Sequence, residues 1–334
     1  MLFRSVSSHD SSRQYTTVLI LSYIGGSIPD TMDWFGVPSI TALVSESYMN
    51  NKKQLTQYYV GQLWRFNAML QGFFVPLMIT ISFVMPTAWL ALGMTFYVGA
   101  SIFILPRLLK NFILKYTGIP GQVVYGGNRP NYPLVTGLIG SGLNTLLLYL
   151  YLVVWQIPRR GILETALIME WGMLPLDIFW GVLAYCYIHY TMVKLKIPLK
   201  QIIIGFFFPA AISLVIMLGI KRAVFDTLNT NYGFFVALVP SILTLASVLF
   251  FVYFPLTGLM GGWDETNLEE FRKVSVMSGP SKIIVIPIYK LINFFCQKSP
   301  LHGRFAMPVA GVVQEAQELL LEKRHNRELF KKAN

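Results

Sequence analysis

Carboxylates inside an apolar stretch are the residues of this sequence best suited to chemistry. Residues 165–193 are mostly apolar but contain Glu170 and Asp177. A spacing of seven places both acids on one face of a helix, about 10 Å apart along its axis. Pro175 lies between them and is expected to kink that helix. Two acids beside a kink could take up protons or cations, or bind a polar head group, in a water-filled cavity. In the alternative interpretation, Glu170 lies near the end of the helix and Asp177 pairs with a neighbouring helix.

A second acidic pair lies near the amino end of the sequence. Asp30 and Asp33 follow Gly25-Gly26 and Pro29, in a long apolar run that these residues interrupt. Such a run could be a broken helix that lines a central cavity. It could equally be an outer turn, with the helix beginning near Asp33. Both interpretations remain open at the level of sequence.

Other polar positions have weaker signals. Glu46 and Arg65 could form an ion pair at a gate, although a pair at helix ends with no role in transport is the favoured interpretation. Asn144 lies in an apolar stretch behind three glycines, where an amide can hydrogen-bond to another helix while the glycines allow close packing. We expect a packing role for Asn144.

Motifs for enzymatic chemistry are missing from the sequence. The four histidines have no metal-ligand spacing, the Gly126-Gly127 loop lacks the GK[ST] of a phosphate-binding loop, and Cys186 and Cys296 are far apart. The sequence therefore predicts no catalytic residue, metal or cofactor. An alternative is a membrane-embedded transferase that uses Asp30, Asp33 and Asp177 on a polyprenyl phosphate, but its metal-binding DDxxD motif is absent.

The amino-acid composition indicates that these residues lie in a membrane protein. Of 334 residues, 54% are apolar and 13% are charged, and residues 201–262 contain only Lys221, Arg222 and Asp226 as charges. A soluble domain is about one quarter charged, so we predict a multi-pass membrane protein. The net charge of +11 arises from basic residues between apolar runs, which is typical of membrane topology and excludes nucleic acid as the expected partner.

Seven stretches are long enough to cross a bilayer as helices, which needs about 20 residues. Continuous apolar runs indicate helices, because barrel strands would alternate. The second and third runs are separated only by the Pro-Thr pair at 86–87. The predicted all-α bundle comprises residues 15–48, 66–85, 87–106, 132–156, 165–193, 201–220 and 232–260.

Basic residues predict the orientation of the bundle. Loops after the first, third and fifth spans carry ten lysines and arginines, and the alternate loops carry four. The positive-inside rule places the richer loops, and the carboxyl terminus, in the cytoplasm of a cell-membrane protein. The amino terminus is then outside with no visible signal peptide, so we expect a missing upstream helix. The predicted organisation is a polar segment (1–14), the bundle (15–260) and a tail (261–334).

The tail opens with four acids at 264–270 followed by Arg272 and Lys273, an order that suits the dipole of a helix. Two further helices are expected after it. Residues 282–297 have an apolar run too short to span comfortably, and we expect them to lie in the membrane interface. Residues 314–330 combine leucines with charges and are predicted to form a solvent-facing amphipathic helix.

Three motifs resemble one family. They are Pro38 followed by Ser45-Glu46-Ser47-Tyr48 and Asn-Lys-Lys; Gly126-Gly127-Asn128-Arg129-Pro130-Asn131-Tyr132 before a span with Leu143-Asn144; and GGWDETNLEEFRK after the last span. In order and spacing, these resemble polysaccharide flippases of the multidrug/oligosaccharidyl-lipid/polysaccharide (MOP, MATE-like) exporter superfamily, the last motif being similar to archaeal tails. Arg159-Arg160-Gly161 departs from the family pattern, as does the lack of a first bundle.

The resemblance implies a fold and a function. Such flippases have two six-helix bundles, often with two further helices, so seven spans would match the trailing part. Alternating access around a lipid-linked oligosaccharide is implied, with Arg65, Arg107 and Arg129 as candidates for the pyrophosphate, unless they only anchor the bundle. A proton or cation could couple transport. The alternatives are a cation-coupled multidrug exporter, and a non-transporting scaffold or half-protein that needs an amino-terminal half on another chain.

Overall fold

The protein is an all-α, multi-pass helical bundle. The computed structural model describes residues 40–157, 171–308 and 310–333, together with Tyr23, Ser27, Glu164, Leu167 and Ile168. Every regular element in the described part of the chain is helical. Six helical stretches there are long and apolar enough to cross a membrane: Lys53–Ala91, Tyr97–Gly126, Asn131–Val154, Leu199–Tyr232, Phe234–Leu259 and Gly279–Lys298. The predicted fold class is therefore confirmed.

The first half of the bundle is built from three long helices preceded by a short one. In chain order the elements are α2 (Thr41–Met49), α3 (Lys53–Ala91), the 3-10 turn η2 (Thr95–Ala100), α4 (Ser101–Gly126), α5 (Asn131–Tyr149) and its π-helical extension η3 (Leu150–Val154).

The second half consists of helices that are repeatedly widened by π-helical turns. Its elements are α7 (Leu174–Tyr187), η5 (Ile188–Met192), α8 (Leu199–Ile202), η6 (Ile203–Phe207), α9 (Phe208–Ile220), η7 (Lys221–Asp226), α10 (Thr227–Tyr232), α11 (Phe234–Val248), η8 (Leu249–Tyr253) and α12 (Phe254–Leu259). The tail contains α13 (Glu265–Met277), the 3-10 turn η9 (Gly279–Ser281), α14 (Lys282–Lys298) and α15 (Ala310–Ala333).

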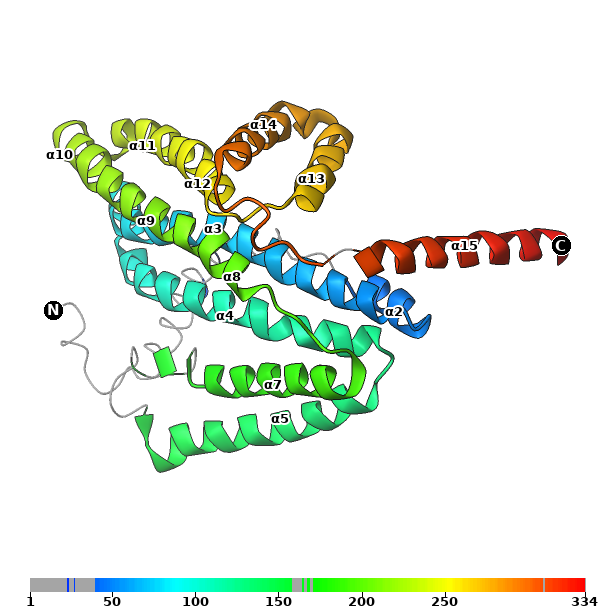
Figure 1. Ribbon diagram of the computed structural model, residues 1–334. Helices are drawn as coiled ribbons and strands as arrows, with labels where there is room; N and C mark the ends of the chain where they lie inside the picture. Colours follow the sequence, from blue (N-terminus) through cyan, green and yellow to red (C-terminus); the bar gives the residue numbers. More distant parts are fainter. Residues whose placement is uncertain are drawn as a thin grey trace.

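The long helices run back and forth along one direction (Figure 1). The links after α2, after α4 and after η5 lie at one end of the bundle, and α15 projects from that end. The link between α10 and α11 lies at the opposite end. The loops that carry Lys52, Arg129 and Lys194 thus share one end, as the charge pattern predicts. Which end faces the cytoplasm stays a prediction.

The boundary predicted between the second and third spans is wrong. Helix α3 continues through Pro86 to Ala91, and the chain turns at Leu92–Met94, where Gly93 has a φ of +72°. Helix α4 then continues past Pro106 to Gly126, through Lys110 and Lys115, which the sequence places in a loop. Proline lacks only one backbone donor, and packing can sustain a helix around it. The positive φ of Gly93 favours the actual turn.

The helix predicted at 165–193 is also interrupted. The chain makes a turn at Gly172–Met173, and α7 begins afterwards at Leu174 with Pro175 in its first turn. Proline suits that position because its missing N–H would have no helical partner there. Pro175 therefore starts a helix, and the predicted mid-helix kink is wrong. A shared face for Glu170 and Asp177 requires a continuous helix between them. The described part of this region is interrupted by the turn at Gly172–Met173, so that requirement is not met.

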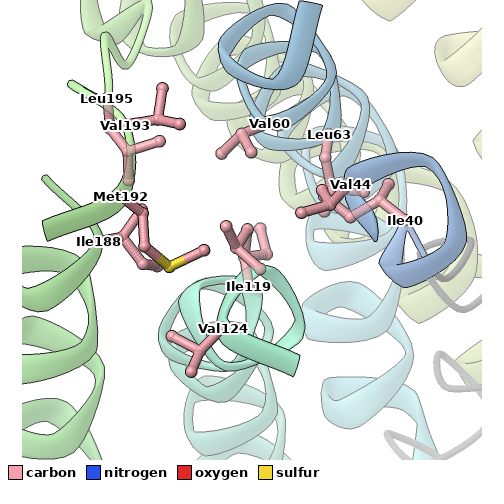
Figure 2. Close-up of a cluster of buried hydrophobic side chains, with 11 residues drawn as sticks. Ile40, Val44, Val60, Leu63, Ile119, Val124, Ile188, Met192, Val193 and Leu195 are labelled. Carbon is pink, nitrogen blue, oxygen red and sulfur yellow. The ribbon is translucent and has the colours of Figure 1, made fainter. Parts of the chain in front are cut away.

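A buried apolar cluster joins the helices at the end from which α15 projects (Figure 2). Ile40 and Val44 come from α2 and its start, and Val60 and Leu63 come from the first turns of α3. The other members come from the end of α4 and from η5 and the link after it: Ile119, Val123, Val124, Ile188, Met192, Val193 and Leu195. The cluster fixes the starts and ends of four elements relative to one another.

The tail is tied to the same part of the bundle. Lys52 forms ion pairs with Glu318 at 2.7 Å and with Glu322 at 3.3 Å on α15. Leu55 and Tyr58 of α3 form an apolar cluster with Val312 and Leu319. Helix α15 is therefore amphipathic, as predicted, and its apolar face packs against α3.

Candidate functional site

A polar groove between three helices of the first half is the strongest candidate site. It has a volume of about 510 Å³ and lies between α4, α5 and α7. Its walls combine small, aromatic and polar side chains: Leu114, Thr117, Gly118, Gly121, Val124, Tyr125, Tyr132, Pro133, Thr136, Gly137, Gly140, Ser141, Asn144, Asp177, Trp180, Gly181 and Ala184. Two residues that the sequence singles out separately, Asp177 and Asn144, thus line the same groove.

Asp177 enters the groove from the first turn of α7, where the chain emerges from the Gly172–Met173 turn. Its side chain is half-buried. Burial between the helices acts against the charge of this carboxylate, and the charge of Lys110 on α4 and the dipole at the amino end of α7 act in its favour.

Two further polar atoms at the groove lack partners. Oδ1 of Asn144 and Nε1 of Trp180 are buried with no hydrogen-bond partner among the described residues. The indole Nε1 lies 3.1 Å from the position that a Cβ on Gly140 would take, and Asn144 is one turn further along α5. A buried polar group without a partner costs about 1–3 kcal/mol. A donor and an acceptor are thus available here to a ligand or to water.

Small residues keep the groove open. No described atom lies within 4 Å of the position that a Cβ would take on Gly118, Gly121 or Gly137. Helix α5 contributes little packing of its own, since Gly140 alone is buried among its nineteen residues. The groove is therefore a feature of how α5 stands away from α4 and α7.

Arg129 lies in the link between α4 and α5, between the groove residues Tyr125 and Tyr132 along the chain. Its guanidinium is exposed and hydrogen-bonds to Tyr48. Pro130 follows as the residue that caps α5, so the predicted motif is a helix start. Tyr132 stacks on Tyr187 at a centroid distance of 4.3 Å, which joins the start of α5 to the end of α7.

The other two candidate arginines lie elsewhere. Arg65 is 4% exposed; its Nη1 donates to Asp264 at 2.7 Å and to Gln201 at 3.0 Å. Arg107 lies in the second turn of α4, about 28 Å from Gly126 along the axis at 1.5 Å per residue. Neither arginine therefore lies with Arg129 at the link between α4 and α5.

The predicted pair of Glu46 and Arg65 is not formed. Glu46 contacts Lys323 of α15 instead. In the polar cluster that contains it, Ser45 is half-buried, whereas Ser47 is fully buried and accepts a hydrogen bond from Thr56 at 2.8 Å. The Ser-Glu-Ser motif therefore joins α2 to the start of α3 and to the tail. Four other candidates fall outside the described residues: Asp30, Asp33, Pro38 and Glu170.

A buried polar face of α3 was not found by sequence analysis. Asn67 is fully buried and Gln71 is 4% exposed. Nδ2 and Oδ1 of Asn67 and Oε1 of Gln71 lack hydrogen-bond partners among the described residues. Trp64 precedes them on the same face, and its buried Nε1 also lacks a hydrogen-bond partner among the described residues. Trp64, Asn67 and Gln71 are spaced i, i+3, i+7 in an apolar run, which places them on one helix face. That spacing could have predicted this polar face, but the sequence interpretation of this run used only ionisable residues.

No cluster of three or more histidine, cysteine, aspartate or glutamate side chains that could hold a metal ion is formed by the described residues. Comparison with protein-family models, curated proteins and solved structures gives no match. The function must therefore be argued from the groove itself.

Proposed function

We propose that the protein is part of a membrane carrier that moves a lipid-linked oligosaccharide across the membrane by alternating access. The proposal rests on one observation: a groove of about 510 Å³ between α4, α5 and α7 that presents Asp177, Asn144 and Trp180. Polar and ionisable groups are costly within the membrane and are there typically found facing an internal pathway. The family resemblance supplies the class of cargo.

The groups in the groove suit a glycan. A carboxylate and an amide oxygen accept hydrogen bonds from sugar hydroxyls, and an indole N–H donates one. The rings of Trp180 and Tyr132 add flat apolar faces. An anionic pyrophosphate would be repelled by Asp177, but Arg129 lies between the groove residues Tyr125 and Tyr132 along the chain, with a guanidinium suited to bidentate phosphate contact. In this proposal the head group binds at Arg129 and the glycan extends along the groove.

The groove has walls on three helices, and α5 exposes apolar side chains on its other faces. Leu134, Leu138 and Leu146 are all more than half exposed. These faces fit lipid, or a second helical bundle that would complete the cavity. In this proposal, the amino-terminal half of a two-bundle carrier, on this or another chain, completes the cavity and rocks against it.

A cation-coupled exporter is the second candidate, and Asp177 is the observation that favours it. A half-buried carboxylate that lines a groove can bind a proton or cation in turn with substrate. The two proposed functions give Asp177 a role in transport of different molecules, so assays with each molecule distinguish them.

The test is transport in proteoliposomes that contain the full chain together with any second half that co-purifies. We expect Asp177→Asn to abolish flux of a fluorescent lipid-linked oligosaccharide, or to uncouple it from a proton gradient, with membrane insertion unchanged. Asp226→Asn is the matched control, because Asp226 pairs with Lys221 outside the groove. Unchanged flux in Asp177→Asn would remove this residue from the mechanism. Flux of a cationic drug alone would favour the exporter, and no flux of either by the wild type would favour a scaffold.

The head-group step has its own test. Replacing Arg129 by Gln removes a charge-assisted hydrogen bond worth about 1.5–3 kcal/mol, so glycolipid affinity should fall about 10- to 100-fold. Equal affinity would return Arg129 to an anchoring role. Arg107→Gln is the control, since Arg107 lies at the other end of α4.

A further inference from the structure

The two helices after the last span form a hairpin whose base is fixed to the bundle. Helix α13 starts at once after α12, with Asp264 accepting a hydrogen bond from the backbone N–H of Asn267 at 3.0 Å. Helix α14 returns to the end of α12, where Gly258 packs against Ile292 and Cys296. Figure 1 shows α13 and α14 side by side beyond α12, with their connection pointing away from α3. We refer to residues 274–284, which form this connection, as the hairpin tip.

The charges of α13 argue against a position of the hairpin in the hydrocarbon core. The segment Gly279–Lys298 is long and apolar enough to span a membrane. However, α13 packs along α14 and carries five charged residues, Glu265, Glu269, Glu270, Arg272 and Lys273. Each charge at the centre of a bilayer costs about 3 kcal/mol or more, so α13 cannot accompany a spanning α14. The alternative consistent with both helices is a position at the membrane surface.

The tip combines exposed apolar side chains with lysines. Met277 and Ile283 are each 83% exposed, and Val274, Val276 and Ile284 are more than half exposed. Lys273 and Lys282 flank them, and Lys290 lies on the exposed face of α14. The acids of α13 lie nearer its base, and Glu269 is neutralised by Arg272 at 2.7 Å. The tip is therefore apolar and basic.

We propose that the hairpin tip binds the anionic lipid surface beside the last span. Its base is attached to the end of α12, where the chain leaves a candidate span, so a leaflet surface lies within its reach. Apolar side chains with basic neighbours enter the boundary between head groups and acyl chains. Each lysine near an anionic surface contributes about a fivefold preference for it. The hairpin would thereby fix the depth of α12 relative to the membrane, together with the ion pair between Asp264 and Arg65 of α3.

The test places an environment-sensitive bimane label at the tip of the full chain in nanodiscs. Ile283→Cys is made together with Cys186→Ser and Cys296→Ala, and nanodiscs contain phosphatidylcholine alone or an equal mixture with phosphatidylglycerol. We expect blue-shifted emission and quenching by lipids with a spin label near the head group, more strongly in the anionic mixture. The triple change Lys273→Gln, Lys282→Gln and Lys290→Gln should reduce the preference for the anionic mixture about 100-fold.

A label at Leu321→Cys in the same background is the matched control, since Leu321 is an equally apolar, exposed residue on α15. It should show water-like emission in both lipids. Water-like emission from the tip label would overturn the proposal, as would contact with a second protein chain without lipid quenching. Quenching only by labels at the bilayer centre would show a spanning helix. Equal quenching in both lipids, unaffected by the lysine changes, would overturn the anionic preference. A Met277→Cys label repeats each measurement should the first variant fold poorly.

Discussion

Glycines on two sides of this bundle differ in the space around them. On the side of α4, α5 and α7, a Cβ on Gly118, Gly121 or Gly137 would meet no described atom within 4 Å. On the side where α3, η6 and the α12–α13 link meet, a Cβ on Gly205 would lie 2.4 Å from Cα of Gly262. The first three glycines leave space beside the groove and Gly205 allows close packing, although Gly181 also lets α7 approach Thr117 of α4 closely.

Buried charges differ between the two sides. The closed side, around Gly205, pairs its charges internally, because Arg65 donates to both Asp264 and Gln201 and all three are at most 5% exposed. The amides of Asn67 and Gln71 on α3 nevertheless lack described partners there too. The open side leaves Oδ1 of Asn144 and Nε1 of Trp180 without described partners. A satisfied network rigidifies a structure, whereas unsatisfied groups are available to a ligand. The closed side is therefore the scaffold on which the open side is positioned.

The largest effect should come from breaking the closed side. Arg65→Met leaves Asp264 buried and unpaired, and removing one partner of a buried ion pair costs about 3–5 kcal/mol. We expect this loss in the unfolding free energy measured by denaturation in mixed detergent. Adding Asp264→Asn should recover most of it, because asparagine keeps the cap on α13 without the charge. Arg272→Met, at an exposed pair, should change nothing measurable. A small loss for Arg65→Met alone would mean that water reaches this site.

A smaller effect should separate the two kinds of glycine. Gly205→Ala places a methyl group against the backbone of Gly262, and overpacking of this kind costs about 1–3 kcal/mol. Gly137→Ala enters open space on α5 and should stabilise that helix by about 0.5–1 kcal/mol. The same unfolding measurement compares them. If both alanines destabilised equally, Gly137 would be packed in the functional assembly and the groove would be closed.

The sequence predicts the bundle better than its details. Long apolar runs identify the helices within 132–156, 201–220 and 232–260, because lipid allows few alternatives to a helix. The run at 165–193 is interrupted, and Gly279–Lys298, a segment expected to be too short to span comfortably, is long and apolar enough to do so. The turn at Gly93 was missed because Pro86 is the more conspicuous signal. Because of Lys110 and Lys115, the second part of α4 was wrongly predicted to be a loop. Long basic side chains can occur within such a helix when their apolar stems pack and their charged ends reach water.

The candidate site was predicted in pieces. Asp177 and Asn144 each stand out in the sequence, but only the packing of α5 beside α7 brings them to one groove. Glu46 was wrongly predicted as the partner of Arg65, because the actual partner, Asp264, lies 199 residues further along the chain. Such long-range pairs are decided by the arrangement of helices, whereas sequence analysis favours nearby residues such as Glu46.

The smallest effect concerns the docking of α15 on the scaffold. A hydrogen bond from Lys52 holds the pKa of Glu318 below its ordinary value. A carboxyl whose folded pKa is lowered stabilises the docked state above its ordinary pKa of about 4.5, and this contribution is lost as the pH falls through the lowered value. The pKa of Lys52 is raised, chiefly by Glu318, so its contribution is lost only as the pH rises above about 10.5.

Docking should therefore be complete near pH 7 and should weaken below pH 4.5 or so. Spin labels on α3 and α15 of the full chain report the distance between the helices, and their distribution should broaden at low pH. Glu318→Gln should show the broader distribution already at pH 7, whereas Glu269→Gln, which alters a pair on α13, should not. The apolar contacts of Leu55 and Tyr58 with Leu319 remain in every variant, so α15 should loosen without leaving. A distribution that is constant from pH 7 to pH 3 would assign docking to these apolar contacts alone.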